Sequence, residues 1–182
     1  TSPRRSGAAH HGGPASRLTA HPGRTERLRH LEVLPRRAAR FAPWPSWVPA
    51  EVRDAFAATG VDQLWLHQAV AADAVWDGQH VVVSTGTASG KSLTYQVPGL
   101  PRILAGRGRR QERGASVLYL APTKALAHDQ LAGLRALGLP VRVSAHDGDS
   151  SPEEREWTRQ HAEYVVTNPD MLHRSLLPGH SR

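Results

Sequence analysis

Short apolar runs rich in β-branched residues alternate with helical patterns along most of this chain, and this alternation constrains its fold more than any other feature. The runs occupy residues 81–83, 116–121, 141–143 and 164–167. Each is too short for a helix and typical of a strand buried in a parallel sheet. Strands that alternate with helices predict an α/β domain with a mostly parallel sheet. Ligands of such sheets bind beyond the carboxyl ends of the strands, so the loops after these runs are the candidate functional regions.

Start and stop signals place helices between the predicted strands. Ser151 and Glu154 form a capping box around Pro152, which predicts a helix over residues 152–161. Asn168-Pro169 is expected to cap a last short helix. The remaining helical patterns cover residues 48–59, 66–76, 91–104 and 123–137.

Positive charge is concentrated at the start of the chain. Residues 1–40 carry nine arginines and two acids, whereas residues 41–182 carry fourteen basic and fourteen acidic residues. The first segment has few large apolar residues, which predicts a disordered arm with sequence-independent affinity for nucleic acid. An inert tail is the alternative. In the Pro- and Trp-rich segment that follows, Trp44 and Trp47 are expected to pack on the domain, with stacking on bases as the alternative.

The sequence contains no cysteine, which excludes disulfides and Cys-ligated metals within these 182 residues. No apolar run approaches the ~18 residues of a membrane-spanning helix. These features fit a cytoplasmic protein without a membrane partner.

A loop suited to phosphate binding lies between the first predicted strand and the next helix. It reads STGTASGKS over residues 84–92. Gly90 supplies a tight turn, and Ser92 supplies a hydroxyl for Mg²⁺. Lys91 supplies a cation for the outer phosphates and is the expected catalytic residue. The strict pattern asks for glycine at position 85, so an ordinary turn and helix cap is the alternative. The residues predicted to contact a nucleotide are Thr85, Gly86, Thr87, Ala88, Ser89, Gly90, Lys91 and Ser92.

Lysine usage favours a real phosphate loop. The chain has 21 arginines but only two lysines, Lys91 and Lys124. A compact ammonium is not interchangeable with a planar guanidinium in a tight phosphate cradle. One of the two lysines stands at the motif position, which a chance turn does not explain.

Four further segments occur in the order of a known enzyme family. They are residues 64–68 (LWLHQ), 121–126 (APTKAL), 146–149 (HDGD) and 166–172 (VTNPDML). Together with the phosphate loop they resemble the first half of a superfamily-two helicase of the DEAD/DEAH-box-like kind, over about residues 62–177. The resemblance implies a RecA-like P-loop domain that binds ATP and Mg²⁺.

Two departures from the family pattern narrow the resemblance. Ala88 stands where the family's loop has glycine, and Thr-Asn-Pro-Asp replaces the usual Thr-Pro-Gly after the last predicted strand. The TASGKS loop looks most like that of a bacterial DNA helicase branch with a C-terminal four-cysteine zinc domain, related to fungal RecQ-four-like enzymes. In that branch the loop does not need glycine at position 85.

The resemblance implies roles for individual residues. Gln68 would bond the adenine edge, against the alternative of an ordinary surface-helix glutamine. Pro122, Thr123 and Lys124 would hold the sugar-phosphate backbone of one nucleic-acid strand, against the alternative of a simple turn between strand and helix.

The later motif has two open interpretations. Thr167, Asn168 and Pro169 resemble a second strand-holding motif, and helix capping by Asn168 explains them equally well. Asp147 and Asp149 have the chemistry of metal ligands, but the resemblance favours a turn that orders the nucleic-acid face, with an ordinary acidic loop as the alternative.

The expected function is the ATP-binding part of an ATP-dependent helicase on single-stranded or partly duplex DNA, with DNA repair as its setting. The expected domains are an arm (1–40), a Pro/Trp segment with a short helix (41–62) and the N-terminal part of a RecA-like domain (63–182) that ends before a DEAH-like box. No strand-end acid suits hydrolysis, so the chain alone is expected to bind ATP without hydrolysing it. The alternatives are another P-loop enzyme, such as a kinase, and a non-catalytic nucleic-acid-binding module.

Overall fold

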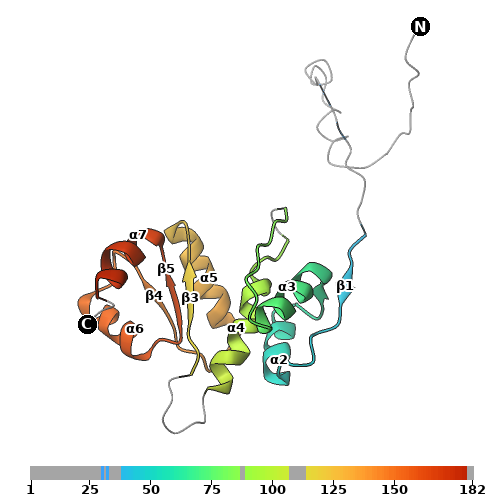
Figure 1. Cartoon of the computed structure of the whole chain (residues 1–182), viewed down its shortest axis with the longest axis horizontal. Coiled ribbons are helices and arrows are strands. Elements are labelled where there is room, and N and C mark those ends of the chain that lie inside the picture. Colours follow the sequence, from blue (N-terminus) through green and yellow to red (C-terminus); the bar gives the residue numbers. More distant parts are fainter. Residues whose placement is uncertain (1–29, 31, 33–37, 87–88, 107–113, 180–182) are drawn as a thin grey trace, which may run out of the picture. The chain divides into compact units, whose positions relative to one another are not determined.

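The computed structural model describes residues 30, 32, 38–86, 89–106 and 114–179. Internal contacts divide the chain into two compact units, Thr1–Ala38 and Ala39–Arg182, and the helices and strands below belong to the second (Figure 1). Most of the expected arm lies outside the described residues, so the arm and the domain boundaries stay predictions. Among the described residues, no helix is long and apolar enough to cross a membrane.

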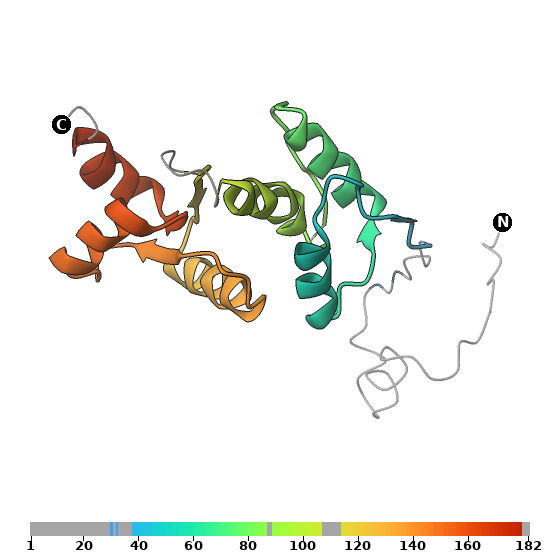
Figure 2. The same ribbon diagram turned by 90° about the horizontal axis from the view of Figure 1, so that it is seen from below.

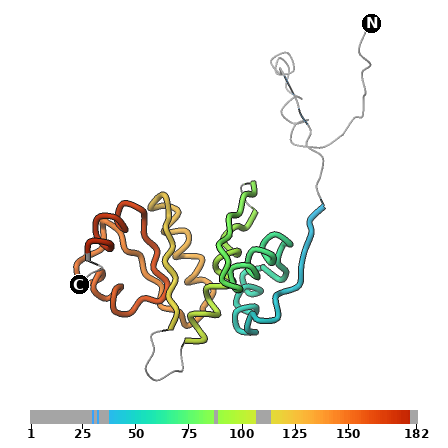
Figure 3. Tube along the Cα trace, viewed as in Figure 1, coloured from blue at the N-terminus to red at the C-terminus, as the bar shows by residue number. Residues whose placement is uncertain are grey.

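The second unit begins with a short antiparallel ribbon and three helices. Strand β1 pairs with β2, and helix α3 follows β2 directly; the backbone N–H of Trp65 donates to Gln68 Oε1 across 2.8 Å, which fixes the start of that helix. Helices α3 and α4 pack against each other, and Figure 3 shows the chain leaving α3 and returning to α4. The elements are β1 (Phe41–Ala42), α2 (Ala50–Ala58), β2 (Leu64–Trp65), α3 (Leu66–Trp76) and α4 (Leu93–Ala105).

A three-stranded parallel sheet forms the other part of the unit. Its strands are β3 (Val117–Leu120), β4 (Val143–His146) and β5 (Tyr164–Thr167), in the order β3-β5-β4. Thr167 is in register with Leu120 on one side and with His146 on the other. All three strands therefore end at the same edge of the sheet, and the loops that follow them emerge together.

Helices cover both faces of this sheet (Figure 2). Tyr164 and Val166 of β5 belong to the apolar core together with Leu131 and Leu134 of α5. Val165 lies on the opposite face, because successive side chains of a strand alternate. The helices are α5 (Lys124–Ala136), α6 (Pro152–His161) and α7 (Pro169–Met171), which continues as a π-helical turn over Leu172–Leu176 and a 3₁₀ turn over Leu177–Gly179.

Several sequence predictions are confirmed in detail. A helix spans Leu66–Trp76 and a strand spans Tyr164–Thr167, each with the expected bounds. The capping box is present: Ser151 Oγ accepts from the Glu154 amide at 3.1 Å, and the Ser151 amide donates to Glu154 Oε2 at 2.8 Å. The strand expected at residues 141–143 instead spans Val143–His146.

The strand expected at residues 81–83 is wrong. The segment is not a strand, and among the described strands the sheet ends at β3. Val82 is 96% exposed and Val81 36% exposed. A β-branched run favours extended backbone, but a strand forms only when a neighbour pairs with its N–H and C=O groups. The described residues provide no such neighbour.

The tryptophans pack on the helices, as expected. The rings of Trp47 and Trp76 stack 4.3 Å apart, and the Arg102 guanidinium lies 5.0 Å from the Trp76 ring centre. Trp47 Nε1 also donates to Asp73 Oδ1 at 2.8 Å. Trp44 stacks on Phe56, with ring centres 5.8 Å apart. These contacts fasten the Pro/Trp segment to α2 and α3.

Candidate nucleotide and nucleic-acid sites

The phosphate loop leads directly into α4. The Leu93 amide donates to Gly90 O, and the Thr94 amide donates to Lys91 O, so helical bonding begins within the motif. The amides at the start of a helix have no partner inside the helix and carry its positive dipole end. The start of α4 therefore presents backbone amides and a positive dipole end, the features that bind phosphate at helix starts.

Gly90 cannot be replaced without disturbing the loop. Its φ of 65° lies in the left-handed region that side-chain-bearing residues avoid. A Cβ at this position would lie 2.4 Å from Gln68 Nε2. The sequence motif and the packing thus require glycine for two independent reasons.

The Lys91 ammonium folds back over the loop. Its Nζ donates to Gly86 O at 2.7 Å and to Thr85 O at 3.2 Å, and it lies 3.5 Å from Ser89 Oγ. A hydrogen bond of 2.6 Å between Thr85 Oγ1 and Ser89 Oγ closes the loop behind it. The ammonium thus already lies among oxygen acceptors, the environment that phosphate oxygens would provide. The predicted contacts of Thr87 and Ala88 lie outside the described residues.

Ser92 is the last residue of the loop, directly before α4, and its hydroxyl oxygen accepts from Gln130 Nε2 at 3.3 Å. A serine hydroxyl next to the phosphate-loop lysine has the chemistry of a Mg²⁺ ligand. The metal-binding role of Ser92 stays a prediction.

Gln68 supports the loop from the opposite side. Its side chain is 3% exposed, and its amide donates to Gly90 O at 2.9 Å and to Ser89 O at 3.3 Å. Nε2 of His67 lies 3.2 Å from the same Ser89 oxygen. Adenine recognition by Gln68 therefore stays a prediction. It requires the side-chain amide to break its hydrogen bonds to the Gly90 and Ser89 carbonyl oxygens.

A cavity of about 510 Å³ opens beside Gln68. Phe41 and Trp65, both more than two-fifths exposed, line it together with Ser89 and Gly90. An aromatic pocket next to a phosphate loop has the size and chemistry to receive a purine base.

The strand-end edge of the sheet brings the other predicted residues together. Pro122, Thr123 and Lys124 follow β3 and are all exposed. Thr123 caps α5, accepting from the Leu126 amide at 3.3 Å. The start of α5 thus presents backbone amides and an ammonium at the surface, a combination that binds phosphate.

Lys124 forms an ion pair with Asp149 from the loop after β4, with 2.7 Å between Nζ and Oδ2. The hydrogen bond to Asp149 raises the pKa of the Lys124 ammonium, and the same bond lowers the pKa of the Asp149 carboxyl. Both side chains are exposed, and exposed pairs contribute little to stability. The pair orients Lys124 without withdrawing it from solvent.

Asp147 is occupied by its own turn. Its Oδ1 accepts from the amides of Asp149 and Ser150 at 3.0 and 3.1 Å and from the Ser150 hydroxyl at 3.2 Å. No cluster of three potential metal ligands is found among the described residues. In this geometry the Asp147 carboxylate holds the turn that follows β4.

The last residue of β5 and the residue that follows it are also bound to their own chain. Thr167 is 2% exposed and donates its hydroxyl to His146 O. Asn168 Oδ1 accepts from the Met171 amide at 2.9 Å, which confirms helix capping. Nucleic-acid contact here would fall to the backbone and to Pro169, which is exposed, and it stays a prediction.

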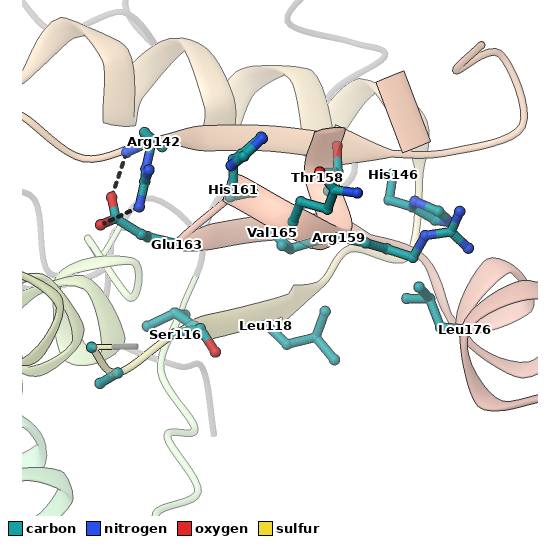
Figure 4. A pocket seen from close by; sticks show the side chains of 15 residues that line it. Ser116, Leu118, Arg142, His146, Thr158, Arg159, His161, Glu163, Val165 and Leu176 are labelled. Carbon is teal, nitrogen blue, oxygen red and sulfur yellow. Dashed lines mark hydrogen bonds and ion pairs between the residues drawn. The ribbon is translucent and has the colours of Figure 1, made fainter. Parts of the chain in front are cut away.

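A separate cavity of about 450 Å³ lies on the sheet face that carries α6 (Figure 4). Leu118 and Val165 from the sheet line it, with Thr158 and Arg159 from α6. Buried His146 also lines it; burial lowers the pKa of this imidazole, as do Arg155 and Arg159. None of the predicted site residues lines this cavity.

Sequence reasoning missed Gln130 and its partners on α4. Gln130 lies on the face of α5 that also carries buried Ala127 and Leu134. A polar residue among apolar ones at helical spacing is the signal that could have singled it out.

Comparisons with known proteins show which family the chain resembles. Residues 65–182 match the DEAD/DEAH box helicase family. The chain is 38% identical to the uncharacterized ATP-dependent helicase YprA of Bacillus subtilis over 83% of its length, and 32% identical to the ATP-dependent helicase HRQ1 of Saccharomyces cerevisiae over 85%. It spans only 20% and 14% of those two proteins.

A solved structure shares the fold. The DUF1998 helicase MrfA, bound to DNA and AMPPNP, superposes with a TM-score of 0.71 at 37% identity, over 80% of this chain and 20% of that one. The expected RecA-like α/β fold is confirmed, and so is the expected bacterial and fungal branch. Because the match covers well over half of its residues, the chain belongs to the DEAD/DEAH box helicase family.

Proposed function

We propose that this chain is the part of an ATP-dependent DNA helicase that binds Mg²⁺–ATP at residues 84–92 and holds a DNA strand at the strand-end edge. The observation that carries the proposal is the placement of the only two lysines. Lys91 stands in the phosphate loop at the start of α4, and Lys124 stands at the start of α5. Each lies at a helix start, where backbone amides and a cation together bind phosphate groups.

The residues around the loop fit the proposed cofactor. Lys91 would hold the outer phosphates and Ser92 the metal, while the cavity beside Gln68 would receive the base. Mg²⁺ would neutralise phosphate charge, and ATP would supply the free energy for movement along DNA. Hydrolysis is proposed for the full-length protein, because Asp147 and Asp149 of this chain are engaged in a turn and an ion pair.

The proposed partner is single-stranded or partly duplex DNA. The MrfA relative is bound to DNA together with a nucleotide analogue. The exposed start of α5 supports contact with backbone phosphates, which position a strand without reading its sequence. A cytoplasmic location and a setting in DNA repair rest on the family resemblance and stay proposals.

Lys124→Ala is expected to weaken binding of single-stranded DNA about equally for all sequences. It is also expected to lower the slope of log affinity against log salt by about one, because one phosphate contact is lost. Fluorescence anisotropy titrations of labelled oligonucleotides at several salt concentrations measure both effects.

The matched control is Arg135→Ala. Arg135 carries the same charge and lies in the last turn of the same helix, away from the strand-end edge. It should leave the slope unchanged. An equal loss in both variants would mean that α5 contributes only diffuse charge, and would contradict a contact at its start.

A further inference from the structure

The Gln130 side chain connects the elements of the two proposed sites, and it has no role in binding at either one. Gln130, half-buried on α5, extends its amide to α4 and to the residue before it. Its Oε1 accepts from the Tyr95 hydroxyl at 2.9 Å and from Gln96 Nε2 at 3.2 Å. Its Nε2 donates to Ser92 Oγ at 3.3 Å. Tyr95 and Gln96 belong to α4, and Ser92 is the residue directly before it.

Gln130 also belongs to the helix that begins at the nucleic-acid edge. It lies six residues after Lys124, or about 9 Å along the helix axis at 1.5 Å per residue. Ala127, Leu131 and Leu134 of the same helix are buried in the core. Such a helix shifts as a packed body, so a displacement at Gln130 also moves Lys124.

A second contact runs parallel to the first. The Tyr95 ring stacks on Tyr119 of β3, with ring centres 5.1 Å apart. Strand β3 ends at Leu120, directly before the residues that open α5. Tyr95 therefore contacts both Tyr119 on β3 and the Gln130 amide on α5, the two elements on either side of the Pro-Thr-Lys segment.

The Ser92 hydroxyl is the point at which a nucleotide would act on this network. In the structure the Ser92 oxygen accepts a hydrogen bond from Gln130. An oxygen that gives a lone pair to a cation accepts such a bond less readily, and its own O–H becomes a better donor. The Ser92 side chain is also hydrogen-bonded to Tyr95, so a change at Ser92 reaches both the Gln130 amide and the Tyr95 hydroxyl that donates to it. The hydrogen bonds of α5 to α4 thus depend on what Ser92 holds.

We propose that Gln130 is a positioning residue that couples nucleotide occupancy at Ser92 to DNA binding at the start of α5. The inference rests on the proposed function, since it needs both ligands. Coupling of this kind is reciprocal: each ligand changes the affinity of the other by the same factor.

The test is a thermodynamic cycle with the 182-residue chain. The affinity for a fluorescent, non-hydrolysable ATP analogue with Mg²⁺ is measured with and without saturating oligothymidine. The affinity for labelled oligothymidine is measured with and without the analogue. The wild-type chain is expected to show a coupling factor of roughly 5–150-fold. Gln130→Met keeps the length of the side chain and removes its polar atoms. It should bind each ligand alone within about twofold of wild type, with a coupling factor near one.

Two further variants make the result decisive. Gln130→Asn keeps an amide on α5 but is one methylene shorter, so it should lose coupling too and serves if Gln130→Met does not fold. Gln160→Met replaces an exposed glutamine of α6 and should keep wild-type coupling. Wild-type coupling in either folded Gln130 variant would overturn the inference but not the proposed function. So would the absence of coupling in the wild-type chain. Absence of nucleotide binding in the wild-type chain would overturn the proposed function and the inference with it.

Discussion

Lys91→Ala is expected to abolish measurable nucleotide binding while leaving the fold intact. Lys91 supplies the only ammonium of the phosphate loop, and its Nζ already lies among the Thr85 and Gly86 oxygens. Each hydrogen bond lost from a charged group costs about 1.5–3 kcal/mol, or roughly tenfold to more than a hundredfold in Kd, and an ammonium donates several such bonds. Titration with a fluorescent ATP analogue measures the loss, and circular dichroism checks the fold.

The two lysines provide a matched pair of controls. Lys124→Ala removes the same side chain from the other site and should bind the analogue like wild type. Lys91→Arg keeps the charge but should fail as well, because a planar guanidinium does not fit a site shaped for a compact ammonium. Wild-type affinity in Lys91→Arg would show that Lys91 acts only through its charge.

Gly90→Ala is expected to unfold at a clearly lower temperature and to lose nucleotide affinity. A side chain at a φ of 65° costs roughly 1–2 kcal/mol. The new Cβ would also displace the buried Gln68 amide, and leaving such a group unpaired costs about 1–3 kcal/mol. Thermal unfolding and analogue titration measure the two effects.

Gly133→Ala is the control for this change. Gly133 lies inside α5, and a Cβ there meets no atom within 4 Å. Alanine should therefore stabilise the helix by about 0.5–1 kcal/mol. If Gly90→Ala kept the unfolding temperature and the nucleotide affinity of the wild type, the loop would not require glycine at this position.

The sequence allowed much of the fold to be predicted, because many of its signals are local. The capping box at Ser151 and Glu154 involves residues three apart, and it formed as expected. The phosphate loop is equally local: one turn of chain contains Gly90, Lys91 and Ser92. Such features depend on interactions between residues that are close together in the chain, so they can be predicted from the sequence alone.

Features that depend on distant partners could not be predicted in the same way. The run at residues 81–83 has strand propensity, but strand formation requires a neighbour that the described residues do not provide. Helical periodicity places Gln130 on the buried face of α5 but does not reveal that α4 lies opposite. The bonds from Gln130 to Ser92 and Tyr95 join residues 38 and 35 positions apart.

Candidate binding residues show a related difference. The resemblance of their motifs predicts that Gln68 and Thr167 contact ligands. In the structure both are buried and bonded to their own chain, Gln68 to the loop at Gly90 and Thr167 to His146. A motif identifies the residues that matter at a site, but it does not separate those that touch the ligand from those that shape the loop.

The most direct test of the two-site account is a map of backbone amide chemical shifts in the isotopically labelled chain. Addition of Mg²⁺ and a non-hydrolysable ATP analogue should shift the amides around Gly90 and Lys91. Later addition of oligothymidine should shift those around Lys124 and Gly148. Nucleotide-induced shifts confined to the cavity of Figure 4, around Arg159 and Glu163, would contradict the account.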